Sequence, residues 1–323
     1  MKRLCIYFFY DKDGIADDYV PFYLKAMREF FSEICVVVNG NLTEESNEKL
    51  KTVCDKLLIR ENTGFDSWAY KEALYSYGLD YIAENFDEVL LNNFTCFGPI
   101  GSFKPMFDKM DKSVCDFWGH CRYYPSEGQK IGNVPIPEHL MSYFILFRKS
   151  ILQSQFWKEY WETLQPVSNY DEARFNHEFR LTPYFEKRGF ISAAFINEQR
   201  CYEIAGYNSP VHDAYDNLIS DSSPLLKRKV FFCREGRYCH YAPFSRYNII
   251  LYHLVKHHLY DLNLIFDNLL RTGDFSFSKC TLTLWHKIKW TIGGNIFRIK
   301  RHLNKLNQFP DFGFIQKVIG RKK

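Results

Sequence analysis

Two adjacent residues in the second half of the chain, His177 and Glu178, are of types that can take a proton from a hydroxyl group. They lie in "NHEFRLTPYFEKRGF", a stretch with a helical pattern that stops at Gly189. A carboxylate or an imidazole beside a bound hydroxyl can act as a general base, and the imidazole has the better matched unperturbed pKa. Both are candidate catalytic residues, although a glutamate on a helix is more often only a solvated side chain.

A second candidate site is the segment "IRENTGFDSWAYKEAL" (59–74), which leaves a predicted strand and opens a predicted helix. The free N–H groups and the positive dipole end of a helix N-terminus favour an anion such as a diphosphate. Arg60 supplies charge, and Gly64 lets the backbone approach a ligand. Asn62 and Asp66 can hydrogen-bond a base or a ribose. The segment lacks both GxGxxG and Walker A patterns, so the plainer interpretation, a turn glycine and an N-cap aspartate, stays open.

A third group of polar residues follows the apolar stretch that begins at Leu90, in "LLNNFTCFGPIGSFKPMF". Asn92, Asn93 and Thr95 can hydrogen-bond a ligand at the end of this predicted strand. Hard divalent cations prefer carboxylates, which supply charge as well as ligand oxygens. Asn93 offers an oxygen without charge and is therefore only a weak candidate metal ligand.

Alternating strands and helices over the first hundred residues position these groups. The predicted strands are 4–10, 34–40, 56–60 and 88–93, and the predicted helices are 16–31, 42–54 (with Thr43 as N-cap) and 65–78. This spacing favours right-handed crossovers and an α/β fold with a mainly parallel sheet. Ligands of such sheets bind at the carboxyl ends of the strands. The three polar turns at 11–14, 60–66 and 92–95 are therefore expected at one edge of the sheet.

The rest of the chain continues with strands and helices and then changes in texture. Strands are predicted in 115–120 and 140–149, and helices in 154–164 and 171–189. After residue 206 the pattern indicates helices and loops wrapped around the first domain. We predict a catalytic domain at 1–205, a helical and loop extension at 206–280 and a basic tail at 281–323.

The composition is that of a globular protein. Hydrophobic residues make up 46% and aromatic residues 18% of the 323 residues, enough for a sizeable core. The ten cysteines contain no CxxC pair, which argues against zinc and fits reduced thiols in a cytosol. No stretch approaches the roughly 20 apolar residues of a membrane span. The first residues are predicted to form a strand, not a signal peptide.

The C-terminal segment 281–323 is strongly basic, with ten Lys and Arg against one acid, Asp311. From Trp285 to Leu306 apolar residues recur at steps of three and four, which predicts one apolar helical face. Such a helix can lie on an anionic membrane surface, or it can dock on its own domain with its basic side in solvent. The body carries 32 basic and 37 acidic side chains, and no base-reading module is recognisable, so nucleic acid is not an expected partner.

Several motifs occur in an order that resembles a known family. They are "ENTGFDSWAYKEAL", "EVLLNNFTCFGPIGSFKPMFDKM", "CDFWGH", "SYFILFRKSIL" with "FWKEYW", "NHEFRLTPYFEKRGF", and "YNSPVHDAYDNLI" with "PLLKRK". Over residues 1–272 the chain resembles the rhamnan synthesis F family, glycosyltransferases of bacterial cell-surface polysaccharide assembly. The resemblance implies a GT-A-like, Rossmann-type sheet flanked by helices. It implies a nucleotide-sugar donor, dTDP-rhamnose or a UDP-sugar, and a polysaccharide or polyprenyl-linked glycan as acceptor. Asn62, Gly64 and Asp66 match its nucleotide-side element.

The chain departs from the family's pattern after the fourth strand. There the family commonly shows asparagine, aspartate and serine, whereas this chain has Asn92, Asn93, Phe94 and Thr95. The missing carboxylate weakens metal binding, so we expect activity without Mg²⁺ or Mn²⁺, while a requirement for either ion stays open. Without a metal, the leaving diphosphate needs protonated side chains or helix N-termini. The candidate cations are Arg60, Lys71, Arg122, Lys227, Arg228 and Lys229.

Two hypotheses follow. The first is an inverting glycosyltransferase, peripheral on the cytoplasmic membrane face, with Glu178 or His177 as base. The second is a catalytically inactive relative that binds glycan or scaffolds an assembly at the membrane, and the Asn92–Asn93 pair motivates it. Replacing Glu178 and Asp66 impairs function only under the first hypothesis.

Overall fold

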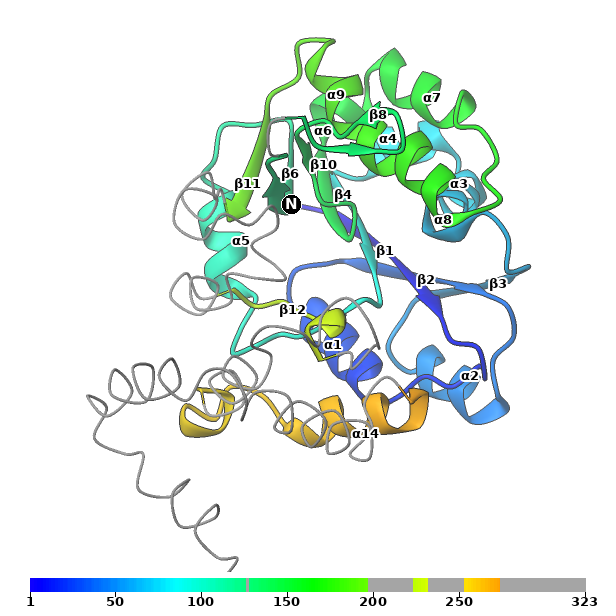
Figure 1. Cartoon of the computed structure of the whole chain (residues 1–323), viewed down its shortest axis with the longest axis vertical. Helices are drawn as coiled ribbons and strands as arrows, with labels where there is room; N and C mark the ends of the chain where they lie inside the picture. Colours follow the sequence, from blue (N-terminus) through cyan, green and yellow to red (C-terminus); the bar gives the residue numbers. More distant parts are fainter. Residues whose placement is uncertain (126–127, 197–222, 232–252, 274–323) are drawn as a thin grey trace, which may run out of the picture.

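The computed structural model describes residues 1–125, 128–196, 223–231 and 253–273. At its centre lies an eight-stranded sheet in the order β11-β6-β10-β4-β1-β2-β3, with β9 paired to β6 (Figure 1). Its strands are β1 (Arg3–Tyr10), β2 (Glu33–Asn39), β3 (Lys56–Arg60), β4 (Glu88–Asn93), β6 (Phe117–Tyr123), β9 (His139–Leu140), β10 (Phe144–Arg148) and β11 (Ser192–Ile196).

The pairing is mainly parallel, as predicted. β1 pairs in parallel with both β2 and β4, and β10 runs antiparallel between β4 and β6. The chain proceeds from β1 to β2 and β3 on one side and resumes with β4 on the other. The strand order therefore reverses between β1 and β4, and such a reversal is where open α/β sheets bind their ligands. This is the GT-A-like arrangement expected from the sequence.

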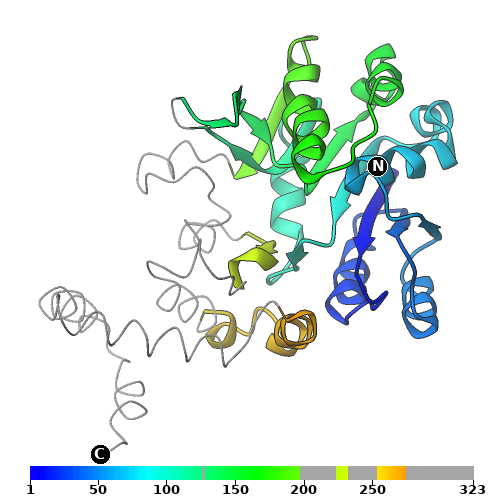
Figure 2. The same cartoon turned by 45° about the vertical axis from the view of Figure 1, so that its right-hand side comes forward.

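Helices cover both faces of the sheet (Figures 1 and 2). Alternate residues of β1 point to opposite faces of the sheet and pack into two separate hydrophobic cores, with Ile6 in one and Tyr7 in the other. The Ile6 face packs against α3 (Phe65–Tyr77), α4 (Leu79–Asn85), α6 (Lys149–Leu152), α7 (Gln155–Glu162) and α9 (Phe179–Glu186). The Tyr7 face packs against α1 (Tyr19–Met27), α2 (Glu44–Lys51), α5 (Lys104–Met110) and α14 (Leu262–Thr272).

Most predicted elements are found within a few residues of their expected bounds. Thr43 is the N-cap of α2, as predicted, since its hydroxyl accepts a hydrogen bond from Ser46 N. The predicted helix 171–189 is instead divided into α8 (Tyr170–Ala173), a π-helical segment (Arg174–Glu178) and α9. π-Helical turns are rare and often occur at functional sites, where they re-aim side chains. Here the π-helical segment ends at Glu178.

The region predicted as an extension contributes to the same core. Leu225, Leu226, Leu254, Ile265 and Leu269 are buried in the cluster on the Tyr7 face. β12 (Leu226–Lys227) pairs with β5 (Cys96–Phe97), and a 3₁₀ turn (Arg228–Phe231) follows it. Residues 206–222, 232–252 and 274–280 of the predicted extension, and the predicted basic helix of 281–323, lie outside the described residues.

In the described part of the chain, no helix has the length and apolar character needed to cross a bilayer.

Candidate functional site

The carboxyl end of β4 meets the start of α3 and the short strand β12. Asn93 Nδ2 donates a hydrogen bond to Asp66 Oδ2 at 3.1 Å, and Asn93 Oδ1 accepts one from Thr95 Oγ1 at 2.6 Å. Lys227 Nζ donates to the same Thr95 hydroxyl at 2.6 Å. Glu178 lies close enough for its charge to act on both Asp66 and Lys227. We call these five residues the Lys227 cluster.

Lys227 is 132 residues away from Thr95 in the sequence, and strand β12 brings the two together. β12 places Lys227 opposite Cys96, and Arg228 N donates to Thr95 O at 3.0 Å. The ammonium group lies 3.8 Å from the centre of the Tyr143 ring, and the side chain is nearly buried. Burial lowers the pKa of Lys227, and the nearby negative charges of Glu178 and Asp66 oppose this by raising it.

The Tyr143 ring that Lys227 contacts is itself held by a chain of buried hydrogen bonds. Tyr143 Oη lies 2.6 Å from His120 Nδ1, and His120 Nε2 lies 2.9 Å from Ser223 Oγ. Ser223 Oγ donates to Leu225 O, so it accepts from His120 Nε2–H, and His120 Nδ1 accepts from the tyrosine hydroxyl. Burial lowers the pKa of His120 to about 3, which keeps this ring neutral. The chain fixes the Tyr143 ring and the segment that leads into β12.

Glu178 is held as a carboxylate by two donors. Ser142 Oγ donates to Glu178 Oε2 at 3.0 Å, and His139 Nε2 lies 3.3 Å from Oε1. His139 Nδ1 lies 2.8 Å from Pro137 O, so both ring nitrogens face acceptors and both donate only in the imidazolium form. Burial raises the pKa of Glu178, but the hydrogen bonds and the charge of His139, the bond from Ser142 and the charge of Lys227 outweigh it, and the pKa falls to about 2.

Asp66 behaves in the opposite way. Burial and the charge of Glu178 raise its pKa, while hydrogen bonds from Asn93 and Ser67 N and the charge of Lys227 lower it less. The environment therefore raises the pKa of Asp66 and lowers the pKa of Glu178. Such a pair is typical of sites that perform proton transfer, although structural networks show it too.

The low pKa of Glu178 predicts a pH-dependent effect on stability. Because the pKa is about 2 in the folded chain against an ordinary 4.5, the ionised group stabilises the fold fully above pH 4.5. That contribution disappears as the pH falls from 4.5 towards 2. We expect the gap in Tm between the parent chain and Glu178→Gln to be largest above pH 4.5 and to shrink on acidification. A gap that stays constant down to the acid limit would contradict the hydrogen-bonded carboxylate.

His177 does not join the cluster. Its side chain is buried, with Nδ1 2.8 Å from Tyr160 Oη and its ring against those of Tyr70 and Trp161. Burial lowers the pKa of His177 to about 4, so the ring is neutral and enclosed. The structure therefore favours Glu178 over His177 as a base.

Arg60 and the loop it precedes form a self-contained turn. Arg60 Nη1 donates to Asn39 Oδ1 at 2.6 Å and to Thr63 O at 2.8 Å, and its Nε pairs with Glu72 at 2.7 Å. Its guanidinium therefore fixes the shape of the loop that leads from β3 to α3. The exposed Asn62 accepts from Asn39 Nδ2 at 3.4 Å and leaves its own donors towards solvent.

Gly64 is the N-cap of α3, in place of the capping role proposed for Asp66. Its φ is +70°, a left-handed conformation that glycine adopts without strain. A Cβ at this position would lie 2.4 Å from Trp68 Cβ. The turn therefore requires glycine, and the next residue, Phe65, is also left-handed with φ of 55°.

The other candidate cations differ in placement. Arg122 pairs with Glu138 at 2.8 Å and Glu186 at 3.2 Å and so ties β6 to α9. Lys71 Nζ lies 4.6 Å from the centre of the Trp68 ring. Two further candidates follow Lys227 in the chain. Arg228 is buried against Tyr19 and Phe94, whereas Lys229 is exposed.

The end of β4 is poorly suited to Mg²⁺ or Mn²⁺. Asn92 Nδ2 donates to Tyr23 Oη, and Asn93 Oδ1 already accepts from both Thr95 N and Thr95 Oγ1. Neither amide carries charge, and the ammonium of Lys227 stands where a second cation would be repelled. Among the described residues no group of three or more His, Cys, Asp or Glu is arranged to hold a metal ion. The donor set does not fit a divalent cation.

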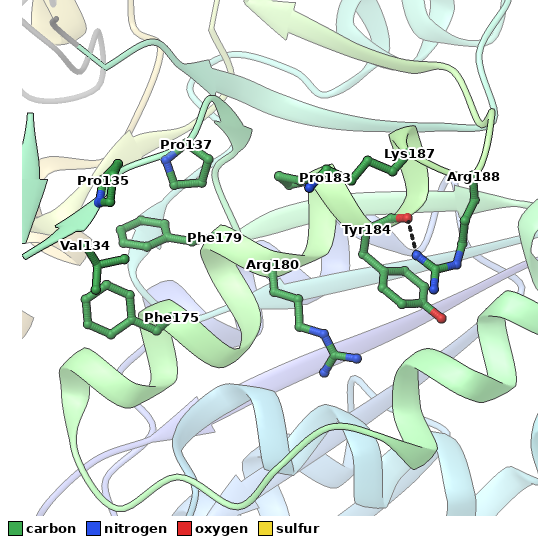
Figure 3. A pocket seen from close by; sticks show the side chains of 10 residues that line it. All are labelled: Val134, Pro135, Pro137, Phe175, Phe179, Arg180, Pro183, Tyr184, Lys187 and Arg188. Atoms are coloured by element: carbon green, nitrogen blue, oxygen red, sulfur yellow. Dashed lines mark hydrogen bonds between the residues drawn. The ribbon is translucent and has the colours of Figure 1, made fainter. Parts of the chain in front are cut away.

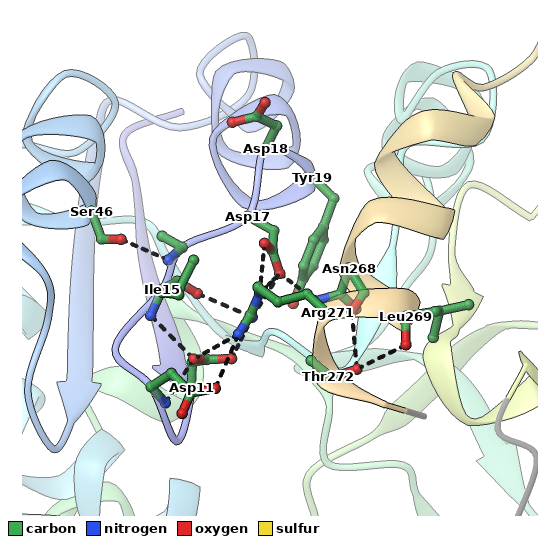
Figure 4. Close-up of polar contacts among 12 residues, drawn as sticks. Asp11, Ile15, Asp17, Asp18, Tyr19, Ser46, Asn268, Leu269, Arg271 and Thr272 are labelled. Atoms are coloured by element: carbon green, nitrogen blue, oxygen red, sulfur yellow. Dashed lines mark hydrogen bonds and ion pairs between the residues drawn. The ribbon is translucent and has the colours of Figure 1, made fainter. Parts of the chain in front are cut away.

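The loop after β1 is fastened to the C-terminal part of the chain. Arg271 of α14 pairs with Asp11 at 2.6 Å and with Asp17 at 2.7 Å, and Asn268 Nδ2 donates to Asp17 (Figure 4). Asp11 also accepts hydrogen bonds from Asp13 N and Ile15 N. The loop at the carboxyl end of β1 is thus joined to α14 by ion pairs and hydrogen bonds, beside the point where the strand order reverses.

Sequence reasoning missed five supporting residues: His120, His139, Ser142, Tyr143 and Ser223. They belong to segments for which only strands, helices or loops were predicted, and none of them was proposed as a site residue. Their importance arises only when β6, β9, β10 and the segment before β12 meet, and no local pattern signals that meeting.

Comparison with known proteins places the chain in a family. The family described as Rhamnan synthesis protein F matches residues 34–292. A curated relative, "Uncharacterized protein y4gN" of Sinorhizobium fredii, is 23% identical over 166 residues. The match covers 51% of this chain and 41% of that protein, so the chain spans less than half the length of this relative.

Three solved structures illustrate the distant similarity of this chain to known folds. A cytidylyltransferase of Leptospira borgpetersenii is 13% identical, with 68% of this chain and 92% of that one covered and a TM-score of 0.35. Core-mannan synthase A of Aspergillus fumigatus is 10% identical, with 76% and 82% covered and a TM-score of 0.36. TarS (1–349) of S. aureus is 15% identical, with 55% and 54% covered and a TM-score of 0.34. Similarities this low do not indicate what the present chain binds.

Proposed function

Because the chain belongs to the rhamnan synthesis protein F family, we propose that it is a glycosyltransferase with a nucleoside-diphosphate sugar as donor. The acceptor is a cell-surface polysaccharide or a lipid-linked glycan, and the transferred sugar is rhamnose or a related hexose. One observation carries the proposal: a buried lysine and two carboxylates of opposite pKa shift meet at the carboxyl edge of the sheet, close to the β1–β4 reversal.

The cluster offers a division of roles. The loop 61–66 and the N-terminus of α3 receive the nucleotide, with Asn62 and Asp66 as hydrogen-bonding groups. Lys227 and Thr95 receive the diphosphate. Burial disfavours the protonated form of Lys227, and a bound anion beside it favours that form again. The protonated ammonium group then stabilises the negative charge of the leaving diphosphate.

Glu178 is the proposed general base. It takes the proton of the acceptor hydroxyl while that oxygen bonds to the anomeric carbon. The bond from this carbon to the diphosphate breaks, and its electron pair leaves on the phosphate oxygen, so the configuration inverts. A carboxylate of pKa about 2 is a weak base. An acceptor hydroxyl that displaces the bond from Ser142 or His139 raises that pKa and makes the group more basic.

We also propose that the protein acts on the cytoplasmic face of the membrane. The ten lysines and arginines of 281–323 support attraction to an anionic surface. A lipid-linked acceptor would be presented at that surface.

The donor assignment is tested by calorimetry of the full chain with UDP, dTDP and GDP. We expect at least one nucleotide to bind, and Asp66→Asn to weaken it. Absence of binding to all three would overturn the donor site and favour the inactive, glycan-binding alternative.

A further inference from the structure

A groove of about 580 Å³ lies between α9 and the hairpin of β7 (Lys130–Ile131) and β8 (Val134–Pro135) (Figure 3). Phe175 and Phe179 line one end of it, and two arginines and a lysine line the other. None of the described lining residues belongs to the Lys227 cluster. The groove is therefore separate from the proposed donor site, and the group that adds to that site is instead a buried side chain beside the cluster.

This side chain is Tyr70 of α3, whose hydroxyl has no hydrogen-bond partner in the part of the chain that the structure describes. The side chain is fully buried, and its ring centre lies 6.3 Å from that of Phe8 and 6.1 Å from that of His177. An unpaired hydroxyl in the interior destabilises a fold, because it has lost its bonds to water without replacing them. Such a group therefore calls for a physical explanation.

The hydroxyl of Tyr70 faces two members of the Lys227 cluster, Asp66 and Asn93. Tyr70 follows Asp66 by four residues in α3, so the two lie on one face of the helix. A long helical side chain extends back over the preceding turn, which here carries Asp66. Burial raises the pKa of Tyr70, the charge of Asp66 raises it further, and Asn93 lowers it. Both residues therefore lie near the hydroxyl, although neither is hydrogen-bonded to it.

Asp66 is the member of the cluster that gains most from a further donor. It is half-buried and accepts hydrogen bonds from Asn93 Nδ2 at 3.1 Å and from Ser67 N at 2.9 Å. A carboxylate has sites for about four hydrogen bonds, so water can occupy the remaining ones while Asp66 is partly exposed. A nucleotide that covers Asp66 removes this water, and burial already raises the pKa of the group. The ionised form then needs another donor from the protein.

We propose that Tyr70 is a positioning residue for Asp66. When a nucleotide covers Asp66, the Tyr70 hydroxyl donates a hydrogen bond to this carboxylate, keeps it ionised and holds it towards the ribose or the base. The hydroxyl hydrogen can rotate towards Asp66, and the half-exposed carboxylate can move towards the hydroxyl. This inference rests on the proposed function, because it requires a nucleotide on the loop 61–66.

The charged groups that face Asp66 come from two other elements. Glu178 of the π-helical segment raises the pKa of Asp66, and Lys227 of β12 lowers it. Tyr70→Phe leaves both groups in place, so they act alike in the parent and in the variant. The difference in nucleotide affinity between the two proteins therefore reports the hydroxyl.

The test is calorimetry of the full chain and of Tyr70→Phe with UDP, dTDP and GDP between about pH 5 and pH 8. Phenylalanine keeps the ring and removes only the hydroxyl. We expect the affinity for the nucleotide that binds to fall about tenfold at the upper pH, because one hydrogen bond to a charged group is lost. The loss should shrink as the pH falls, since a protonated Asp66 gains much less from the donor. Without nucleotide, the Tm of Tyr70→Phe should equal or exceed that of the parent, because an unpaired buried hydroxyl has been removed.

Tyr77→Phe is the matched control. Tyr77 also belongs to α3, and its hydroxyl is likewise buried and unpaired, but its neighbours include Cys35 and Glu33 and no member of the cluster named above. We expect Tyr77→Phe to bind the nucleotide as the parent does at every pH. An equal loss of affinity in both variants would show that the effect does not depend on a position next to Asp66.

Three further results would overturn the inference while the proposed function stands. They are equal nucleotide affinity of the parent and Tyr70→Phe at every pH, a loss of affinity that does not change with pH, and a Tm of the unliganded variant below that of the parent. The last result would show that the hydroxyl already stabilises the fold without a ligand. If the parent binds none of the three nucleotides, the proposed function fails and this inference fails with it.

Discussion

Replacing Lys227 with methionine is expected to lower kcat/KM for sugar transfer by about 10²–10³, the usual cost of removing one charge-stabilising donor from an enclosed site. Methionine keeps much of the side-chain volume but removes the ammonium, which lies over the Tyr143 ring, donates to Thr95 Oγ1 and interacts with the charges of Glu178 and Asp66. Steady-state transfer from the nucleotide sugar that binds is the measurement.

Lys109→Met is a matched control for this variant. Lys109 Nζ also donates a hydrogen bond, to Phe195 O at 2.8 Å, and lies 4.8 Å from the centre of the Phe195 ring, but it belongs to α5. We expect it to retain parental activity. Equal losses in both variants would mean that the loss does not depend on the position of Lys227 in the cluster, and unchanged activity in Lys227→Met would remove Lys227 from the mechanism.

The second large effect is expected for Glu178→Gln. The amide is nearly isosteric but cannot take the proton of the acceptor hydroxyl, so kcat should fall by about 10²–10⁴ while the nucleotide still binds. The measurement is kcat for transfer, together with calorimetric nucleotide affinity. Hydroxylamine or another acceptor that needs little deprotonation should recover part of the rate.

Glu186→Gln provides the control. Glu186 is at the end of α9, the helix that directly follows Glu178, and it accepts a hydrogen bond from Arg122 of β6, but it lies outside the cluster. It should stay within a few-fold of the parent. Asp66→Asn separates the two carboxylates: we expect it to weaken nucleotide binding more than it lowers kcat. If Asp66→Asn instead abolishes kcat while Glu178→Gln is active, the base is Asp66, whose raised pKa then has a catalytic meaning.

The main fold was predictable because the first four strands and their helices have strong local patterns. The apolar run of β1 and the β-branched run of β2 favour buried parallel strands, and Thr43 marks a helix start by its own side chain. The antiparallel placement of β10 was not predictable, because strand direction depends on the route of the loops between β6 and β10.

The site was predictable only in part. Asp66, Asn93 and Thr95 follow strand ends, so the topology itself implied their proximity. Lys227 could be identified only as one of six candidate cations, since its place depends on the two-residue strand β12. His177 and Glu178 are neighbours in sequence, but the π-helical turn directs one into the core and the other to the cluster.

The central claim, that Lys227 performs the charge-neutralising role that a metal has in other enzymes, is tested by nucleotide calorimetry on metal-free protein. We predict that the nucleotide which binds the parent chain does so equally well in EDTA and in Mn²⁺ or Mg²⁺, and that Lys227→Met weakens it in both. Binding that requires the divalent ion, with Lys227→Met indistinguishable from the parent, would contradict the account.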